Sequence, residues 1–162
     1  MLYPAQLYKE ELTQKLVQCW YTEKYSYYFG GEFREYIVPT NPEGKRDFVH
    51  LTVDGKVDGY FSYWHDRVAK SLNNFGLISF TNNGFPLIID VEKHLKHLIK
   101  IGEIQRIEFW AFEDNPVNKL YKHFMNKYNG KEVGYLHNSA WFDGKYHNTI
   151  IYEILIKNNG HE

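Results

Sequence analysis

The segment at residues 75–112 constrains the fold more than any other part of the chain. It begins with a short apolar run at 75–80, which is typical of an internal strand, and ends with a second expected strand at 105–112. Between them, apolar residues recur at helical spacing, at Ile88, Val91, Leu95, Leu98 and Ile99, and Gly102 follows as a helix end. A strand, helix and strand of this length join parallel neighbours by a right-handed crossover. We therefore expect two parallel strands at the centre of a sheet.

Before this unit, the chain contains one clear helical pattern and one ambiguous stretch. An apolar stripe at three- and four-residue spacing predicts a first helix, and its members are Tyr8, Leu12, Leu16, Cys19 and Trp20. Residues 21–33 are aromatic and end in Gly30-Gly31, so they form a short helix, an ordered loop or a lid. Residues 32–38 are expected to form a strand, and residues 40–46, with Pro42 and Gly44, a loop.

Two Asp-Gly pairs each lie between β-prone runs. Asp54-Gly55 separates residues 48–53 from 56–64, and Asp143-Gly144 separates 133–142 from 145–156. Asp-Gly favours a two-residue type I′ turn, because both central positions require positive φ. We expect two antiparallel hairpins.

A further helix is expected between the second parallel strand and the last hairpin. Asp114-Asn115-Pro116 places a capping side chain before a proline at the first helical position, where the missing N–H costs nothing. Asn129-Gly130 closes the helix. The whole order predicts an α+β fold with three α/β/α layers. Its mixed, mostly antiparallel sheet should have about six to seven strands, with two central parallel strands.

Composition limits the class of protein. A chain of 162 residues fits one domain over residues 1–162, because domains typically run about 100–200 residues. The net charge of −1 supplies no field to gather nucleic-acid phosphates. No apolar run approaches the roughly 20 residues that cross a bilayer, and charged residues interrupt positions 1–20. The single cysteine needs no oxidising compartment. We expect a cytoplasmic protein with neither a membrane nor a nucleic-acid partner.

Residues 107–121 carry the most specific pattern in the chain. They read Ile-Glu-Phe-Trp-Ala-Phe-Glu-Asp-Asn-Pro-Val-Asn-Lys-Leu-Tyr. This run resembles the fifth strand and the following Asn-x-x-Ala-x-x-Leu-Tyr helix motif of the GNAT acyltransferase superfamily, with a spacing one residue shorter. Together with the order of elements, the resemblance covers roughly residues 33–156. It implies an acetyl-CoA-dependent N-acyltransferase.

The resemblance also implies where coenzyme A would bind. In such enzymes the two parallel strands splay apart, and the pantetheine arm hydrogen-bonds to the edge of the fourth strand. That edge corresponds here to Leu77, Ile78, Ser79 and Phe80, and the family's phosphate loop corresponds to Asn82, Asn83, Gly84 and Leu87.

The phosphate loop departs from the family pattern of Gln/Arg-x-x-Gly-x-Gly/Ala. It has one glycine and no arginine, and Pro86 removes a backbone donor. We expect Asp90 and Glu92 in the first turn of the next helix, where acidic groups would repel a pyrophosphate. Lysines farther along the helix either compensate or form a solvated face, at Lys93, Lys96 and Lys100.

The catalytic roles also follow from the resemblance. Tyr121 matches the tyrosine that protonates the departing thiolate, although it is also placed as a core aromatic. The acceptor amine needs a base or a water chain to one. Glu108 is the first candidate and Asp58 and His50 are alternatives, although a structural or exposed position also explains each of them. Asn115 matches a cofactor contact but is equally a helix cap, and Asn118 is grouped with it as a cofactor contact.

The last hairpin is crowded with aromatic and imidazole side chains: His137, Trp141, Phe142, Tyr146 and His147. In this family such a hairpin often borders the acceptor site, while cross-strand packing alone also explains it. No metal site is expected, because His94-x-x-His97 lacks further ligands at diagnostic spacing. Hydrolase and nucleotide-binding motifs are absent from the sequence.

The leading hypothesis is acetyl transfer from acetyl-CoA to a primary amine by direct attack, without a covalent enzyme intermediate. The acceptor is a small-molecule or peptide amine, and homodimers are common in the family. The alternative is a degenerate binding module of the same fold that has lost coenzyme A binding. A third reading is an aromatic surface for a protein partner.

Overall fold

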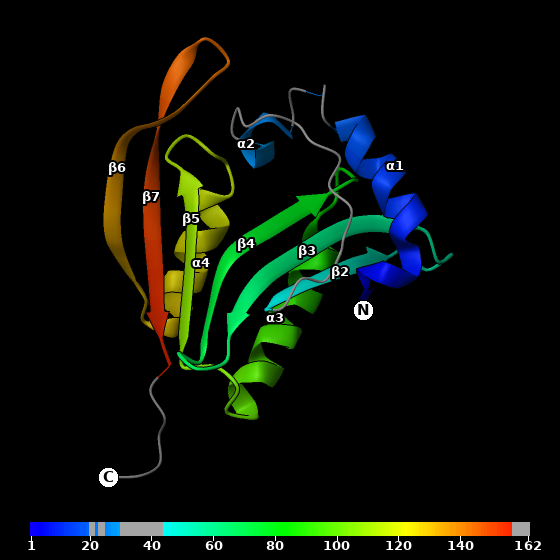
Figure 1. Ribbon diagram of the computed structural model, residues 1–162, viewed down its shortest axis with the longest axis horizontal. Helices are drawn as coiled ribbons and strands as arrows, with labels where there is room; N and C mark the ends of the chain where they lie inside the picture. The colour runs from blue at the N-terminus through cyan, green and yellow to red at the C-terminus, as the bar shows by residue number, and fades with distance from the viewer. Residues whose placement is uncertain (20–21, 23–24, 30–43, 157–162) are drawn as a thin grey trace.

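The structure is a computed structural model, and it describes residues 1–19, 22, 25–29 and 44–156 (Figure 1). The helical elements are η1 (Ala5–Tyr8), α1 (Lys9–Cys19), α2 (Ser26–Phe29), α3 (Phe85–Lys100) and α4 (Asn118–Tyr128). The strands are β1 (Leu2–Pro4), β2 (Lys45–Leu51), β3 (Val57–Asp66), β4 (Ser71–Ser79), β5 (Arg106–Phe112), β6 (Lys131–Phe142) and β7 (Lys145–Leu155).

The described strands form one seven-stranded sheet in the order β1-β2-β3-β4-β5-β7-β6. Every neighbouring pair is antiparallel except β4 and β5, which are parallel. Helices α3 and α4 cover one face, while α1 and α2 lie on the other (Figure 1). The predicted α+β class, with its three layers and two central parallel strands, is confirmed.

The two faces of the sheet bury separate apolar clusters. Behind the sheet, Leu95 of α3 and Met125 of α4 pack with Ile107, Phe109 and Tyr152 of β5 and β7. In front, α1 buries Leu12 and Leu16 against Val49, Tyr60 and Ile78. Strand β3 supplies residues to both clusters, Phe61 to the first and Tyr60 to the second, because successive side chains of a strand point to opposite faces.

The first predicted helix is confirmed as α1, which ends at Cys19. Within the ambiguous stretch at 21–33, residues 26–29 form the short helix α2. The expected strand at 32–38, and most of the expected loop at 40–46, lie outside the described residues. The loop prediction was wrong at Lys45 and Arg46, which belong to β2 and pair with Trp64 and Tyr63.

The two Asp-Gly hairpins differ in their turns. Asp143 and Gly144 have φ values of 50° and 74°, as the type I′ prediction requires. The same prediction was wrong for Asp54-Gly55, where only Gly55 has positive φ. There the Thr52 hydroxyl donates to the Asp54 carboxylate at 2.6 Å and accepts the Lys56 N–H at 3.1 Å. These local bonds close a longer loop.

Two helix starts differ from the prediction. Helix α4 begins at Asn118 rather than at Pro116, and Asn115 accepts the Val117 N–H at 3.0 Å in the preceding turn. Helix α3 begins at Phe85, with Pro86 in its first turn. The prediction that Asp90 and Glu92 lie in the first turn of this helix was therefore wrong, because both residues follow that turn.

The parallel strands part soon after they meet. β4 and β5 pair only through Ser71 with Arg106 and Leu72 with Ile107, and beyond Leu72 they diverge (Figure 1). The antiparallel pairing of β4 with β3 continues as far as Ser79, and that of β5 with β7 as far as Phe112. Each strand is thus held by its other neighbour while the two separate.

Candidate functional site

Beyond Leu72, no strand in the described part of the chain pairs with the edge of β4 that faces the gap. The Phe80 N–H donates to the Asp58 carbonyl of β3 at 2.9 Å. Because successive residues of a strand direct their backbone groups to opposite edges, Ile78 also bonds toward β3, while Leu77 and Ser79 face the gap. The Ser79 carbonyl accepts the Tyr25 hydroxyl at 3.2 Å. Of the four predicted edge residues, only Leu77 and Ser79 can offer main-chain bonds to a ligand in the gap.

An apolar cavity of about 50 Å³ lies between the sheet, α3 and α4. Its wall exposes no polar atom. Aliphatic residues line it at Leu77, Ile88, Val91, Leu95, Ile99, Ile107, Leu120 and Ile154, and aromatic residues at Phe61, Phe75, Phe109, Tyr121, Phe124 and Tyr128. Leu77 lines this cavity, and its backbone N–H and carbonyl face the gap beside β4.

Tyr121 lies in the first turn of α4 and contributes to the cavity wall. Its ring packs edge-on against Phe109, with 4.6 Å between the ring centroids. Burial raises the pKa of Tyr121 to about 12, with a smaller contribution from Tyr152. No residue that the structure describes hydrogen-bonds to the Tyr121 hydroxyl. The phenol is therefore protonated at neutral pH and keeps its proton available.

The loop before α3 uses part of its own hydrogen-bonding capacity. Asn83 accepts the Phe85 N–H at 3.2 Å through Oδ1, and the Thr81 hydroxyl donates to the Asn83 carbonyl at 3.1 Å. A Cβ on Gly84 would come within 3.2 Å of the Ser79 Cβ, so this position favours glycine. Leu87 buries its side chain, and Asn82 is exposed. Within the described part of the chain, the N–H groups of Gly84 and Leu87 have no partner.

The acidic residues of α3 are paired with cations. Asp90 forms ion pairs with the N-terminal amine of Met1 and, at 3.1 Å, with Lys93. Glu92 pairs with Lys96 at 2.8 Å and with Lys127 of α4. Hydrogen bonds from Lys127 and Lys96 lower the pKa of Glu92 to about 2. Lys93 and Lys96 thus neutralise acids of their own helix.

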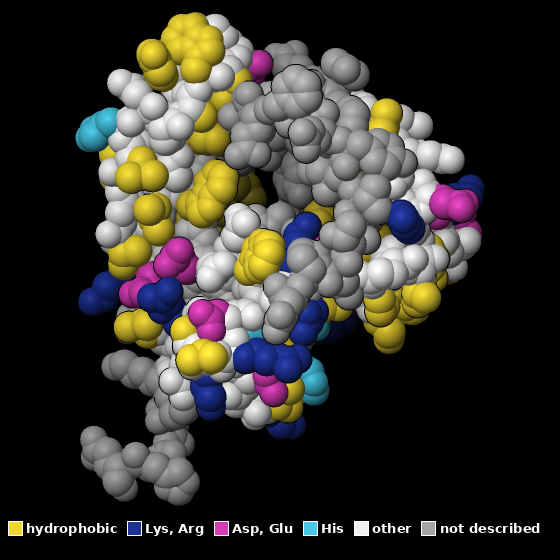
Figure 2. Space-filling model, in the orientation of Figure 1, with side chains coloured by type: hydrophobic (Ala, Val, Ile, Leu, Met, Phe, Trp, Pro, Cys, Tyr) yellow, Lys and Arg dark blue, Asp and Glu magenta, His cyan; other side chains and the backbone are white. Residues whose placement is uncertain are grey.

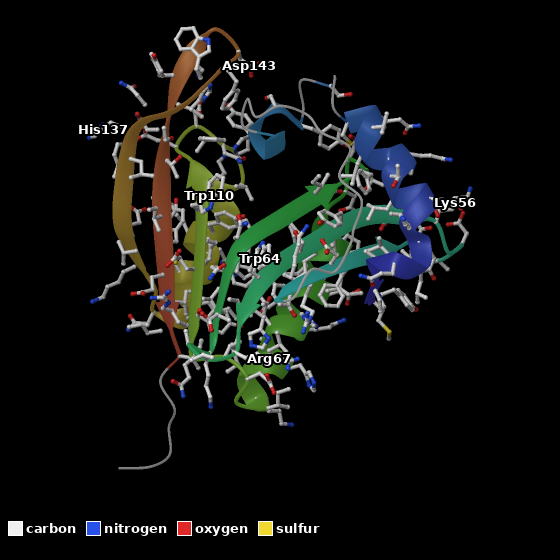
Figure 3. The ribbon with its side chains drawn as sticks, in the orientation of Figure 1. Lys56, Trp64, Arg67, Trp110, His137 and Asp143 are labelled. Atoms are coloured by element: carbon white, nitrogen blue, oxygen red, sulfur yellow. The ribbon has the colours of Figure 1, made fainter. Side chains whose placement is uncertain are left out.

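Glu108 lies on the other face of β5 from the cavity. Phe109 faces the cavity, so its neighbours Glu108 and Trp110 point to the face that carries α1. The Glu108 carboxylate is 3.5 Å from the Arg106 guanidinium. Trp110 is 43% exposed and is drawn in Figure 3. Glu108 follows Ile107, the last residue of β5 that pairs with β4.

The two alternative base candidates form a cluster of their own. His50 Nδ1 is 2.5 Å from an Asp58 oxygen, and His50 Nε2 is 3.3 Å from Asp90 of α3. Neither His50 nor Asp58 lines the cavity that contains Tyr121. Glu108 does not line that cavity either, but it directly follows Ile107, where the pairing of β4 with β5 ends, and so it stays the first candidate.

The motif asparagines hold the end of β5. The Asn118 amide donates to the carbonyls of Phe112 at 2.7 Å and Glu113 at 2.9 Å, and its oxygen accepts the Tyr152 hydroxyl at 2.9 Å. Asn118 is buried. These bonds leave no amide proton for a ligand, so Asn118 positions α4 rather than contacting a cofactor. Asn115 does not cap α4, whose N-cap residue is Val117; its side chain instead closes the turn before the helix by accepting the Val117 N–H.

A cluster at the last hairpin was not foreseen from the sequence. Buried His147 has Nδ1 3.0 Å from Asp114 and Nε2 3.2 Å from the Phe142 carbonyl. Its ring stacks on Phe142 at 3.6 Å, and Tyr27 of α2 packs edge-on against both rings. Lys145 pairs with the same Asp114 at 2.6 Å. Asp114 and His147 are 33 positions apart, so no local pattern linked them.

The other hairpin residues lie on the surface. His137 points away from the gap on the outer side of β6 (Figure 3). Figure 2 shows hydrophobic side chains gathered over β6 and β7. The exposed members of this hairpin are Val133, Tyr135, Leu136, Trp141, Tyr146 and Leu155.

The His94-x-x-His97 pair does not converge on one point. His94 Nε2 is 2.8 Å from the Tyr63 hydroxyl, and burial lowers the pKa of His94, whereas His97 is exposed. Among the described residues, no group of three His, Cys, Asp or Glu side chains could hold a metal ion. No helix in the described part of the chain is long and apolar enough to cross a membrane.

The sequence matches no family model and none of the curated proteins. The structure, however, is similar to solved acetyltransferases. A spermidine N-acetyltransferase from Vibrio cholerae, crystallised with CoA and spermine, superposes with a TM-score of 0.67 and 15% identity, over 96% of this chain and 94% of that chain. A putative phosphinothricin N-acetyltransferase superposes with a TM-score of 0.68 and 15% identity, over 98% of this chain and 99% of that chain.

A third similar structure is an acetyltransferase from Salmonella typhimurium that modifies the N-terminal serine of a 50S ribosomal subunit protein. Its TM-score is 0.54 and its identity 15%, over 71% of this chain and 66% of that chain. These three proteins share an architecture with this chain, although little of the sequence is common. The chain therefore has the fold of the GNAT N-acetyltransferases.

Proposed function

We propose that this protein is an N-acetyltransferase that transfers an acetyl group from acetyl-CoA to a primary amine. The observation that carries the proposal is the divergence of β4 and β5 beyond Leu72, with the backbone of Leu77 and Ser79 facing the gap. Pantetheine contains two amides and needs such a hydrogen-bonding edge. The fold shared with three acetyltransferases supports the same conclusion.

In the proposed mechanism the two faces of β5 have different roles. The Leu77 N–H and carbonyl and the Ser79 N–H hold the pantetheine amides, which places the thioester carbonyl in the gap. The amine approaches from the face of Glu108, whose carboxylate accepts its proton. The neutral amine nitrogen then attacks the carbonyl carbon, the carbon–sulfur bond breaks, and the Tyr121 hydroxyl donates its proton to the departing thiolate. The second proton lost by the nitrogen as it becomes an amide returns to the Tyr121 oxygen, and Glu108 releases the first proton to solvent.

The phosphate site is the weakest part of the donor site. The N–H groups of Gly84 and Leu87 are available at the start of α3, where the helix dipole favours an anion. The Phe85 N–H is not available to a phosphate, because it donates to the Asn83 side chain. We therefore expect most of the affinity for coenzyme A to come from the pantetheine arm. The acceptor is a small-molecule or peptide amine, and the homodimer remains a prediction.

Thermal unfolding with and without coenzyme A tests the donor site. A ligand that binds only the folded state stabilises it by roughly 2.7 kcal/mol at about 100 times its Kd. The transferase predicts a higher unfolding temperature with CoA. The alternative, a binding module that has lost this site, predicts no shift, and such a result would remove the proposed activity.

The substitution Tyr121→Phe tests the acid. Turnover should fall roughly 10²-fold, because general-acid assistance is typically worth roughly 10²–10⁴-fold. The unfolding temperature should not change, because no described residue bonds to the hydroxyl. Tyr3→Phe, on the distant strand β1, is the matched control. Undiminished turnover in Tyr121→Phe would make Tyr121 a packing residue only.

A further inference from the structure

The cavity between α3 and α4 differs chemically from the gap beside it. The edge of β4 offers backbone donors and acceptors at Leu77 and Ser79, whereas the cavity wall exposes no polar atom. An amide moved into such a cavity loses its hydrogen bonds to water and gains none in return. Pantetheine amides are therefore confined to the strand edge, and the cavity suits hydrocarbon.

Two residues of the wall indicate which hydrocarbon this is. Leu77 belongs both to the cavity and to the edge that would hold the pantetheine arm, and Tyr121 is the proposed proton donor to the sulfur. The only alkyl group next to that sulfur, on the carbonyl side, is the acyl chain. An acyl chain longer than acetyl would extend from the thioester into the cavity.

The size of the cavity sets the length of the chain. An apolar cavity of about 150 Å³ accepts benzene, which has six carbons. By proportion, about 50 Å³ accommodates about two carbon atoms. Acetyl extended by two carbons is butanoyl. We propose that this cavity is an acyl pocket, and that the protein binds butanoyl-CoA more tightly than acetyl-CoA. This inference rests on the proposed acyl transfer and specifies its donor.

The test compares dissociation constants for acetyl-, propanoyl-, butanoyl- and decanoyl-CoA, measured by calorimetry without an acceptor. Burial of one methylene is worth about fourfold in affinity. Butanoyl-CoA should therefore bind about 15-fold more tightly than acetyl-CoA. Decanoyl-CoA should gain nothing beyond butanoyl-CoA, because its chain exceeds the cavity.

The outcomes separate this inference from the function on which it rests. If acetyl-CoA binds as tightly as butanoyl-CoA, or more tightly, the acyl pocket is refuted while the transferase stands. If none of the four thioesters binds, the acyl pocket and the transferase fall together. A gain that continues to decanoyl-CoA would also refute a pocket limited to four-carbon groups.

Filling the cavity gives an independent test. Val91→Phe places a larger side chain in the wall and should abolish the preference for butanoyl-CoA over acetyl-CoA. Val53→Phe makes the same chemical change at a fully exposed position and should keep the preference. If Val91→Phe does not fold, Leu120→Phe fills the cavity from a half-buried position on α4. An unchanged preference in a folded cavity variant contradicts the acyl pocket.

Discussion

Asn118 joins three elements through its side chain: β5, α4 and β7. It donates to two carbonyls at the end of β5 and accepts the Tyr152 hydroxyl. In the sequence Asn118 was placed among the cofactor contacts because it lies in the motif segment. In the structure, both amide protons and the oxygen of this side chain are hydrogen-bonded within the fold. The sequence does not show these partners, because they lie on other elements.

We predict that Asn118→Ala destabilises the protein by about 2–4 kcal/mol, because three hydrogen bonds, two of them buried, are lost at once. Asn115→Ala removes a single hydrogen bond, in the turn before α4, and should cost about 1 kcal/mol. Urea unfolding of both variants measures the difference. Equal losses would mean that the three hydrogen bonds of Asn118 contribute no more than the single turn bond of Asn115.

Other residue roles differ in how far the sequence revealed them. Tyr121 was identified from the resemblance, but the packing of Phe109 and Tyr152 around it, which leaves its hydroxyl without a hydrogen bond to any described residue, could not be. The pairing of Asp114 with His147 could not be predicted. Each residue already had a local explanation, one in a helix cap and the other in an aromatic hairpin.

At the scale of elements, Glu92 connects α3 to α4. Its carboxylate accepts hydrogen bonds from Lys127 and Tyr128 at the end of α4, and from Lys96 on its own helix. These two helices form the outer walls of the cavity. The connection therefore fixes the spacing of the walls.

The folded-state pKa of Glu92, about 2, lies below its ordinary value of 4.5. A depressed carboxyl pKa contributes stability above pH 4.5, and this contribution is lost as the pH falls from 4.5 toward 2. We predict that Glu92→Gln lowers stability at pH 7 by about 1 kcal/mol and loses less between pH 4.5 and 2 than the wild type. Chemical unfolding at several pH values measures this. Glu10→Gln, on α1, is the control and should keep the pH dependence of the wild type. If Glu92→Gln also keeps the wild-type pH dependence, the lowered pKa of Glu92 is contradicted.

Long periodic elements were predictable, but their ends were not. The apolar spacing identified α1, α3 and α4, because packing one face of a helix requires that spacing. The start of α3 was misplaced, which put Asp90 and Glu92 in the wrong turn. Strand β1 was missed because Leu2–Pro4 is too short for a period to show, and it forms through pairing with β2.

At the scale of the whole molecule, the gap between β4 and β5 arises from the way in which each strand pairs with its other neighbour, which the sequence pattern does not predict. The strand, helix and strand pattern predicted parallel neighbours, and the structure confirms them. Their divergence depends on β4 following β3 and β5 following β7 along most of their lengths. Only the family resemblance suggested it, since local periodicity carries no information on how far two strands stay together.

The central claim is that the gap-facing edge of β4 holds coenzyme A. The most direct measurement is amide hydrogen exchange, residue by residue, with and without saturating CoA. The N–H groups of Leu77 and Ser79 should exchange more slowly when CoA is bound, while those of Ile78 and Phe80, already bonded toward β3, should not change. Unaltered exchange at Leu77 and Ser79 in the presence of CoA would contradict the proposed site.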